Sequence, residues 1–331
     1  KQALKIIDIK SMNTAQTSMK LSVIIPVYNK ADYIEDCLDS LLSQDCDSFE
    51  VVAVDDGSTD SSGAICDERA AAESRLRVVH TANGGVTAAR RTGVEQARGE
   101  YIVFVDADDR MAPRGLSTLL GAIERTGADE VVATYDNQRG QHIATGITGW
   151  ADTEWMIGQL LGCCHRFCIL WGVIFRRQLL ENCLTAPRVI RAGEDSLMQL
   201  LCLLKQPRVY FIPDSVYIYT DGLPNSRRLN IEEQKAYDSA LTAALAPEWD
   251  RYGDLFTLRQ IKMYEEFVCE GQFGVLGAYY RKVRKRLSPR IPLADRIAVM
   301  LPPWLAWGAV RLRKWMVRKR LGITASPARG R

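Results

Sequence analysis

Three aspartates follow a run of apolar residues in segment 101–109, which reads Tyr-Ile-Val-Phe-Val-Asp-Ala-Asp-Asp. The apolar run lacks strict alternation, which predicts a strand buried on both faces of a parallel sheet. Asp106, Ala107 and Asp108 stand at its carboxyl end, where open α/β sheets bind ligands. Carboxylates this close repel one another unless a cation lies among them, and Mg²⁺ or Mn²⁺ suits such oxygens together with phosphate. The segment therefore predicts a metal site for a phosphorylated ligand, with a solvated acidic turn as the alternative.

Polar clusters also follow the other predicted strands. They are Pro-Val-Tyr-Asn at 26–29, Val-Asp-Asp-Gly-Ser-Thr-Asp at 54–60 and Asn-Gly-Gly-Val-Thr-Ala-Ala-Arg at 83–90, joined later by Gly-Glu-Asp at 193–195. Ligands of open α/β sheets bind beyond the carboxyl ends of the strands, so these clusters are expected to form one site.

Strands and helices alternate through the first part of the chain. The predicted strands are Leu21–Val27, 49–54, Leu76–His80, 101–105 and 130–135, and the predicted helices are Ile34–Leu42, 86–97 and 113–125. This alternation argues for a parallel, doubly wound sheet with helices on both faces. Further along, short strands are expected at 209–212 and 216–219, and residues 231–290 have a helical pattern.

Composition excludes several classes of protein. The chain has 331 residues, of which 47% are hydrophobic and 25% charged, enough for one large domain with an appendage or for two domains. The net charge of +3 is too small to indicate nucleic-acid binding by the whole chain. Residues 1–20 lack the apolar segment of a signal peptide and represent a natural extension or an added tag.

The nine cysteines are odd in number and follow no framework spacing. They favour buried thiols in a reducing compartment. Cys163, Cys164, His165 and Cys168 resemble half of a zinc site. No second cluster completes four ligands at the usual spacing, so a structural zinc ion is not expected.

In their order and spacing, the five clusters resemble family 2 glycosyltransferases, which are inverting enzymes with the GT-A fold that use nucleotide-sugar donors. The resemblance covers about residues 21–226. It implies an α/β GT-A domain with a Rossmann-like, mostly parallel central sheet, divided into a nucleotide-sugar-binding half, 21–135, and an acceptor half, 136–226. A helical C-terminal extension at 227–331 would follow.

The same resemblance implies an activity. A hexosyl or N-acetylhexosaminyl group would pass from a nucleotide-sugar, with UDP as the expected nucleotide, to a hydroxyl of a glycan or lipid-linked saccharide. Cell-surface polysaccharide synthesis is the common setting of the family.

A donor site for the base is implied at the ends of the first two strands, with Pro26, Tyr28, Asn29, Asp55 and Asp56 as its residues. Tyr28 offers an aromatic face to a uracil ring, and Asp56 offers an acceptor for the ring N–H, with Asp55 as the other possible partner. Taken alone, Tyr28 is better interpreted as an ordinary loop tyrosine.

The phosphates and sugar are assigned to the next two strand ends, at Asn83, Gly84, Arg90, Asp106 and Ala107. Asn83, Gly84 and the glycine after them begin a helix, whose N-terminus favours anions, although two adjacent glycines also suit a plain turn. Arg90 could reach a phosphate or pair with a strand-end carboxylate. The family often has asparagine after this arginine, whereas this chain has Arg91, which cannot accept a hydrogen bond.

Metal, base and acceptor residues complete the implied site. Asp108 matches the last acid of the Asp-x-Asp motif and is the expected metal ligand, with Asp106 near the ribose, the sugar or a metal-bound water. Asp195 matches the general base that deprotonates the acceptor hydroxyl, with helix capping as the structural alternative. The acceptor cleft is assigned to Trp171, Gly172 and Glu194, and Asn225-Ser226 matches a polar pair of unclear role.

Two other functions are compatible with the same motifs. A nucleotidyltransferase acting on sugar phosphates shares acidic strand ends, and a non-catalytic sugar-binding module could retain the fold. A dehydrogenase is disfavoured because no Gly-x-Gly-x-x-Gly follows the first strand. A P-loop NTPase is disfavoured because the chain has no Gly-Lys-Ser/Thr.

The C-terminal end predicts contact with an anionic membrane surface. Residues 297–310 carry no charge but, at 14 residues, are shorter than the roughly 17–25 needed to span a bilayer, and Pro302-Pro303 would interrupt or start a helix there. Basic residues flank this stretch at 281–286 and 311–320. Segment 281–320 is therefore expected to hold a cytoplasmic protein on the inner face of the plasma membrane, with a helix packed on the domain as the alternative.

Overall fold

The computed structural model describes residues 19–162, 167, 170–221, 230–273 and 277–320. Cys163, Cys164, His165, Cys168 and the pair Asn225-Ser226 therefore lie outside the described residues, as do residues 1–18. No helix among the described residues is long and apolar enough to cross a membrane.

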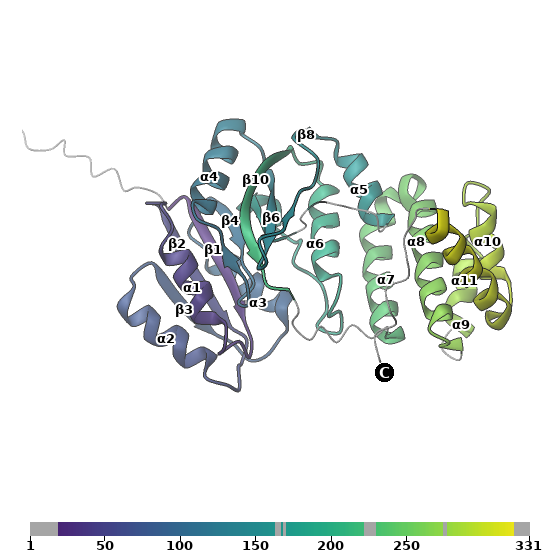
Figure 1. Cartoon of the computed structure of the whole chain (residues 1–331), viewed down its shortest axis with the longest axis horizontal. Coiled ribbons are helices and arrows are strands. Elements are labelled where there is room, and N and C mark those ends of the chain that lie inside the picture. Colours follow the sequence, from purple (N-terminus) through teal and green to yellow (C-terminus); the bar gives the residue numbers. More distant parts are fainter. Residues whose placement is uncertain (1–18, 163–166, 168–169, 222–229, 274–276, 321–331) are drawn as a thin grey trace, which may run out of the picture.

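Among the described residues, ten strands form one sheet, which lies to the left in Figure 1. Its strands are β1 (Leu21–Val27), β2 (Phe49–Asp55), β3 (Leu76–His80), β4 (Tyr101–Phe104), β5 (Arg110–Met111), β6 (Glu130–Asn137), β7 (His142–Ile143), β8 (Gly149–Ala151), β9 (Val173–Arg176) and β10 (Val209–Tyr219). The order is β3-β2-β1-β4-β9-β6-β10-β5, with β7 on β6 and β8 on β10. The α/β class predicted from the sequence is confirmed.

The pairing differs between the two halves of the sheet. Strands β3, β2, β1 and β4 pair in parallel, as the alternating sequence pattern predicts. Beyond β4, strand β9 runs antiparallel to both of its neighbours, while β6 and β10 are parallel to each other. The four carboxyl ends of the parallel half therefore lie along one edge, which is where the sequence places most of its polar clusters.

The strands of the parallel half are buried on both faces. In β4, Ile102 and Phe104 pack into one apolar cluster, and Tyr101 and Val103 pack into the other. The first cluster contains side chains from α3 (Val86–Gln96), α5 (Thr153–Leu161), α6 (Glu194–Leu203), α7 (Ile231–Leu245) and α8 (Trp249–Cys269). The second contains side chains from α1 (Ile34–Leu42), α2 (Ser62–Ala72) and α4 (Gly115–Thr126). Alternate side chains point to opposite faces of a strand, so helices cover the sheet on both sides, which explains the unbroken apolar runs in the sequence.

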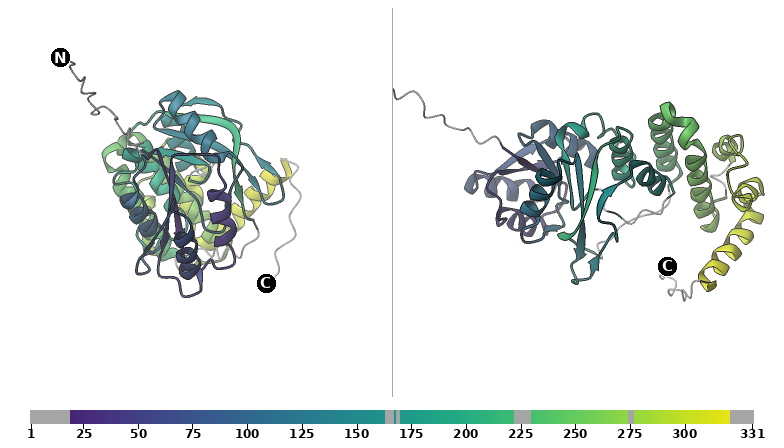
Figure 2. Two further views of the ribbon diagram at one scale, coloured as in Figure 1. Left: turned by 90° about the vertical axis from the view of Figure 1, so that its left-hand side faces the viewer. Right: turned by 90° about the horizontal axis from the view of Figure 1, so that it is seen from above.

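The helices are α1 (Ile34–Leu42), α2 (Ser62–Ala72), α3 (Val86–Gln96), α4 (Gly115–Thr126), α5 (Thr153–Leu161), α6 (Glu194–Leu203), α7 (Ile231–Leu245), α8 (Trp249–Cys269), α9 (Gly277–Arg284), α10 (Leu293–Met300) and α11 (Pro303–Arg320). Two short 3-10 helices lie at Arg177–Leu180 and Ala246–Glu248. The end of α8 packs with α9, α10 and α11 around a third apolar cluster, and these helices form the end of the molecule away from the sheet (Figures 1 and 2).

Two local expectations need correction. The short strands expected at 209–212 and 216–219 form one strand, β10, whose register against β6 shifts between Phe211 and Tyr217 to accommodate Pro213. Pro113 precedes α4 and does not form its first turn, because Arg114 adopts a left-handed conformation with φ 63° before the helix begins. Neither change moves a strand end at the predicted site.

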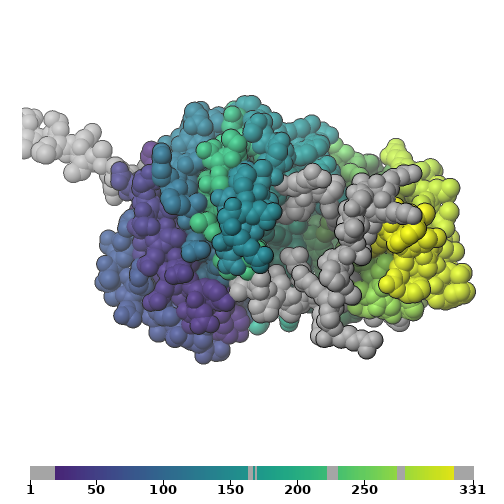
Figure 3. All heavy atoms as spheres, viewed as in Figure 1, coloured from purple at the N-terminus to yellow at the C-terminus, as the bar shows by residue number. Residues whose placement is uncertain are grey.

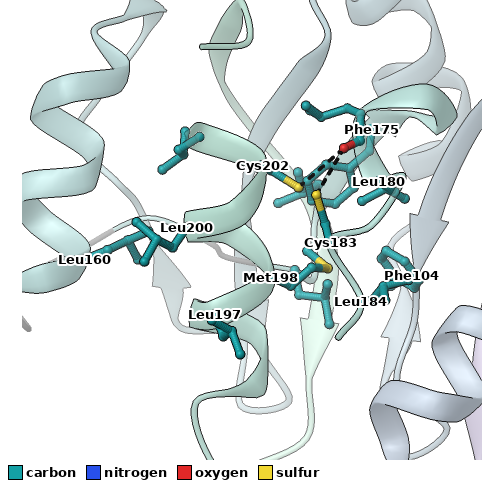
Figure 4. Close-up of a cluster of buried hydrophobic side chains, with 14 of the residues drawn as sticks. Phe104, Leu160, Phe175, Leu180, Cys183, Leu184, Leu197, Met198, Leu200 and Cys202 are labelled. Carbon is teal, nitrogen blue, oxygen red and sulfur yellow. Dashed lines mark hydrogen bonds between the residues drawn. The ribbon is translucent and has the colours of Figure 1, made fainter. Parts of the chain in front are cut away.

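Helix α6, which carries Glu194 and Asp195, is anchored by its apolar face. Leu197, Met198 and Leu200 are buried in the cluster drawn in Figure 4. Cys202 of α6 and Cys183 both donate to the carbonyl oxygen of Leu179, with the sulfur atoms 4.0 and 3.3 Å from it. These contacts fix the helix rigidly, and so they fix the position of the acidic pair at its first turn.

Candidate active site

A cleft of about 810 Å³ lies at the carboxyl ends of β1, β2 and β4. Nine residues predicted from the sequence line it: Pro26, Tyr28, Asp56, Asn83, Arg90, Asp106, Ala107, Asp108 and Glu194. The cleft is within the range of about 300–1,000 Å³ that is usual for small-molecule sites. The remaining six predicted residues, Asn29, Asp55, Gly84, Trp171, Gly172 and Asp195, are not among the described residues that line it.

One end of the cleft is formed by the ends of β1 and β2. Tyr28 has 46% of its surface exposed, so its ring is open to a ligand. Asp56 is buried, and its two carboxylate oxygens accept hydrogen bonds from the backbone N–H groups of Gly84 and Gly85 at 2.8 and 2.7 Å. The sequence assigned the start of α3 to anion binding, and here the chain supplies that anion itself through Asp56.

Asn29 and Asp55 connect loops. Asn29, at φ 51°, accepts a hydrogen bond from the Thr59 N–H through its side-chain oxygen at 2.8 Å. Asp55 accepts from the Ser58 N–H at 3.0 Å and contacts His80 Nδ1 at 3.0 Å. Burial would raise the pKa of Asp55, but these hydrogen bonds lower it overall. Both residues thus hold the turns from which Tyr28 and Asp56 reach the cleft.

Arg90 joins two of the acidic clusters. Its guanidinium is buried and lies 2.8 Å from Asp106 Oδ1 and 3.3 Å from Glu194 Oε1. Of the two alternatives that the sequence left open for Arg90, pairing with a strand-end carboxylate is the one observed in this structure. The arginine therefore holds the first turn of α6 against the end of β4, and it compensates the charge of both acids.

Asp108 pairs with Lys30, whose Nζ lies 2.5 Å from its Oδ2. Lys30 follows β1 in the chain and lines the same cleft, although the sequence gave no reason to select it. No cluster of three metal-ligating side chains is found among the described residues. Two neighbouring carboxylates, Asp106 and Asp108, nevertheless suit a divalent cation that takes its other ligands from water and a phosphorylated substrate.

Asp109, the third aspartate of the segment, has a structural role at the same turn. It is buried and accepts hydrogen bonds from Tyr217 Oη at 2.7 Å and from the Thr220 N–H at 2.7 Å. Burial raises the pKa of Asp109 to about 7, against the opposing effect of these two bonds. Asp109 ties the Asp-x-Asp turn to β10 and leaves Asp106 and Asp108 facing the cleft.

The acidic pair at the start of α6 is divided between two environments. Gly193 precedes the helix at φ 94°, and a Cβ there would lie 3.1 Å from the ring of Tyr237, so glycine is required. Glu194 lines the cleft, and burial raises its pKa while Arg90 opposes that rise. Asp195 is half-buried one residue further on, where its Oδ1 accepts from the Ser196 N–H at 2.7 Å.

Trp171 belongs to an aromatic group at the ends of β6 and β10. Its ring stacks on Tyr219 with centroids 5.6 Å apart and meets Tyr135 edge to face. The indole N–H is buried and has no hydrogen-bond partner among the described residues. Gly172, at φ 69°, continues into β9. Trp171 and Tyr219 belong to the half that the sequence assigned to the acceptor, and Tyr135 is the last residue of the half assigned to the donor.

The sequence missed three basic residues that line the cleft. Besides Lys30, they are Arg188 and Arg191, in the segment that leads into α6. A Cβ on Gly85, which has φ 91°, would lie 3.2 Å from Arg188 Cγ, so Arg188 passes close over the start of α3. Two arginines shortly before Gly-Glu-Asp were the available signal, but no periodic element predicts where such a segment runs.

Comparisons with known proteins agree with this geometry. Residues 22–182 match the family model described as glycosyl transferase family 2. The uncharacterized glycosyltransferase EpsJ of Bacillus subtilis is 35% identical over 214 residues, which is 62% of each chain. A poly(ribitol-phosphate) beta-glucosyltransferase of Bacillus spizizenii is 31% identical over 208 residues, 61% of this chain and 32% of the relative. The matched regions thus span less than two thirds of these relatives.

Among solved structures, S. aureus TarS 1-349 in complex with UDP-GlcNAc superimposes with a TM-score of 0.60 over 93% of each chain. At 21% sequence identity, this similarity establishes the fold. It extends through the C-terminal helices, since the match covers nearly the whole chain.

Proposed function

Residues 22–182 form a domain of glycosyl transferase family 2, and from this premise we propose that the chain transfers a sugar from a UDP-sugar to a hydroxyl of a glycan or glycolipid acceptor, with inversion at the anomeric carbon. The observation that carries the proposal is the convergence of Asp106, Asp108 and Glu194 on one cleft. The acids come from segments about ninety residues apart in the sequence, which a solvated acidic turn does not explain. The glycosyltransferase names of the relatives support the same reaction class, and one of them is named for poly(ribitol-phosphate), a polymer that carries hydroxyl groups.

The donor is proposed to bind with its base on Tyr28 and its diphosphate toward the basic residues of the cleft. Tyr28 supplies an exposed aromatic face, and Asp56 lines the same cleft. Besides Arg90, which pairs with Asp106, the cleft offers the cationic groups of Lys30, Arg188 and Arg191 to a diphosphate. UDP-GlcNAc in the TarS structure motivates the choice of uridine as the nucleoside.

Asp106 and Asp108 are proposed to hold a divalent cation with the donor diphosphate. When bound, Mg²⁺ or Mn²⁺ would offset negative charge on the departing diphosphate. Lys30 Nζ lies 2.5 Å from Asp108 Oδ2, so a cation bound at that oxygen would displace the ammonium. The displaced Lys30 remains within the cleft, where a diphosphate oxygen is its natural new partner.

Asp195 is proposed to take the proton from the acceptor hydroxyl as the hydroxyl oxygen attacks the anomeric carbon. Glu194 and Arg90 are positioning residues in this scheme, because their ion pair fixes the first turn of α6 beside Asp106. The transition state resembles an oxocarbenium ion, as in glycoside hydrolysis, and the opposite-face attack gives inversion. Trp171, Gly172 and Glu194 are proposed to border the acceptor.

We also propose peripheral attachment to the cytoplasmic face of the plasma membrane through residues 281–320. This segment has thirteen Lys or Arg residues and one acid, Asp295. Such a charge imbalance favours an anionic leaflet, and attachment there would bring the enzyme to a lipid-linked acceptor.

A binding measurement tests the donor assignment. Changing both Arg188 and Arg191 to alanine is expected to raise the Kd for UDP about 10-fold or more, since each charged hydrogen bond to a phosphate contributes on the order of 1.5 kcal/mol. The matched control is Arg125→Ala, an exposed arginine of α4 outside the cleft lining. Isothermal titration calorimetry with UDP gives both values. Equal UDP affinity in the double variant and in Arg125→Ala would remove these arginines from the donor site.

A further inference from the structure

The outer surface of α10 and α11 exposes an unusual amount of apolar side chain. Nine of the fifteen large apolar residues that are exposed in the described chain belong to these two helices. Leu293, Met300 and Trp304 are the most open, at 63%, 60% and 65% exposed. Single exposed apolar residues are normal, whereas a group of this size marks an interaction surface.

This exposed surface is distinct from the faces that hold the helices in place. Val299 of α10 and Ala306 of α11 are buried in the apolar cluster formed with α8. On the other side of α10, Leu293, Ile297 and Met300 follow at intervals of four and three residues, so they form one stripe. Packing against α8 therefore explains the apolar residues on one side of each helix, but it does not explain those on the exposed side.

Ion pairs to buried acids connect α10 and α11 to α8. Arg313 of α11 pairs with Glu265 of α8 and, at 2.8 Å, with Asp295 of α10. Lys262 of α8 lies 2.6 Å from the same Asp295 oxygen. The acids are buried and paired, so the exposed surface keeps an excess of positive charge.

A small apolar pocket opens between the two helices. It has a volume of about 230 Å³ and is lined by Ala294, Ile297, Ala298 and Leu301 on one side and by Ala309, Val310 and Arg313 on the other. This volume is below the 300–1,000 Å³ usual for metabolites, and six of these seven residues are apolar. Ile297 belongs both to the exposed stripe and to the pocket, so the two are continuous.

The surroundings of this surface are basic. Arg281, Lys282, Lys285 and Arg286 are exposed at the end of α9 and just beyond it, and Arg311 is exposed on α11. Apolar side chains flanked by cations are complementary to anionic lipid, whose headgroups are negative and whose chains are apolar. The helices lie at the end of the molecule away from the sheet (Figures 2 and 3).

We infer that the exposed face of α10 and α11 inserts into the surface of an anionic bilayer, and that the pocket between the helices takes part of one lipid acyl chain. Leu293, Met300 and Trp304 enter the boundary between headgroups and acyl chains, while the basic residues of α9 contact headgroups. This inference specifies the membrane attachment proposed above, and it is independent of the transferase reaction.

Vesicle flotation with the full chain tests the inference, in the absence of donor. Vesicles of phosphatidylcholine alone are compared with vesicles that contain phosphatidylglycerol. Wild type should float with the anionic vesicles only. Changing Met300 and Trp304 together to serine should weaken binding at least 10-fold, whereas Trp150→Ser, at a tryptophan of β8 that is 52% exposed, should not.

Two further variants separate the parts of the surface. Changing Arg281, Lys282 and Lys285 to glutamine should weaken binding about 100-fold, because each basic residue near an anionic leaflet contributes about fivefold. These residues are exposed, so this variant carries little risk of misfolding. Ala309→Phe fills the pocket, and it should weaken binding while leaving the other residues intact.

Several results would overturn the inference. If wild type floats with anionic vesicles but the Met300/Trp304 variant floats equally well, the protein attaches through another surface and the general attachment proposal survives. If wild type fails to float at low salt, both are wrong. A third result would identify a dimer interface. In that case wild type would not bind vesicles, light scattering would show that it is dimeric, and the Met300/Trp304 variant would be monomeric.

Discussion

Replacing Asp195 by asparagine is expected to lower kcat by about 10²–10⁴, the usual loss when a general base is removed. Asparagine keeps the shape of the side chain and its hydrogen bond to the Ser196 N–H but cannot accept the acceptor's proton. Because Asp195 is not among the residues that line the donor cleft, the Kd for UDP should change by less than about twofold. Steady-state kinetics and calorimetry on one preparation measure the two quantities.

Glu194→Gln is the matched control for this prediction. Glu194 adjoins Asp195 and lines the cleft, and it is held by Arg90 in an ion pair at 3.3 Å. The ion pair gives Glu194 a positioning role in the proposed scheme, so Glu194→Gln should reduce kcat less than Asp195→Asn does. If Asp195→Asn retains near wild-type kcat while Glu194→Gln loses activity by several hundredfold, then Glu194 is the base and the assignment is wrong.

The second large effect is expected from removal of the divalent cation or of its proposed ligand. Excess EDTA should abolish turnover, and Mn²⁺ or Mg²⁺ should restore it. Asp108→Asn should lower kcat/KM at least about 100-fold, because the charge on the leaving diphosphate is no longer offset. A readout apart from activity is the rise in Tm when Mn²⁺ and UDP are added together, which the variant should lose.

Asp45→Asn controls for the loss of one negative charge, since this exposed residue lies outside the cleft lining. It should retain both the Mn²⁺-dependent rise in Tm and the activity. Full turnover in excess EDTA would refute the cation requirement. It would then favour Lys30 as the group that compensates Asp108 throughout the reaction, because the two already pair in this structure.

The sequence was sufficient to predict the parallel half of the sheet and the location of the cleft. Strand and helix alternate with clear periodicity there, and parallel strands necessarily bring Tyr28, Asp56 and Asp106 to one edge. The extent of β10 was harder to predict, because Pro213 interrupts the apolar pattern of the sequence although the strand continues past it. Strand β9 gave no sign that it runs antiparallel, since a short buried strand has the same composition in either direction.

Contacts between residues far apart in the chain could not be predicted from the sequence. Lys30 and Asp108 are 78 positions apart, and Arg90 and Glu194 are 104 apart, so no local spacing predicts either pair. Arg90 had two plausible kinds of partner in the sequence, and only the three-dimensional structure shows it between Asp106 and Glu194. Arg188 was missed because irregular segments carry no periodicity from which their position can be inferred.

The central claim is sugar transfer from a nucleotide-sugar, and the most direct measurement is product analysis after incubation with a panel of nucleotide-sugars and hydroxyl-bearing glycan acceptors. The proposal predicts release of a nucleoside diphosphate, UDP first among them, in equal amount to a glycosylated product. The anomeric configuration of the new bond, read by nuclear magnetic resonance, should be opposite to that of the donor. Release of pyrophosphate from a nucleoside triphosphate and a sugar phosphate would instead identify a nucleotidyltransferase, and binding of donors without any product would indicate a non-catalytic module.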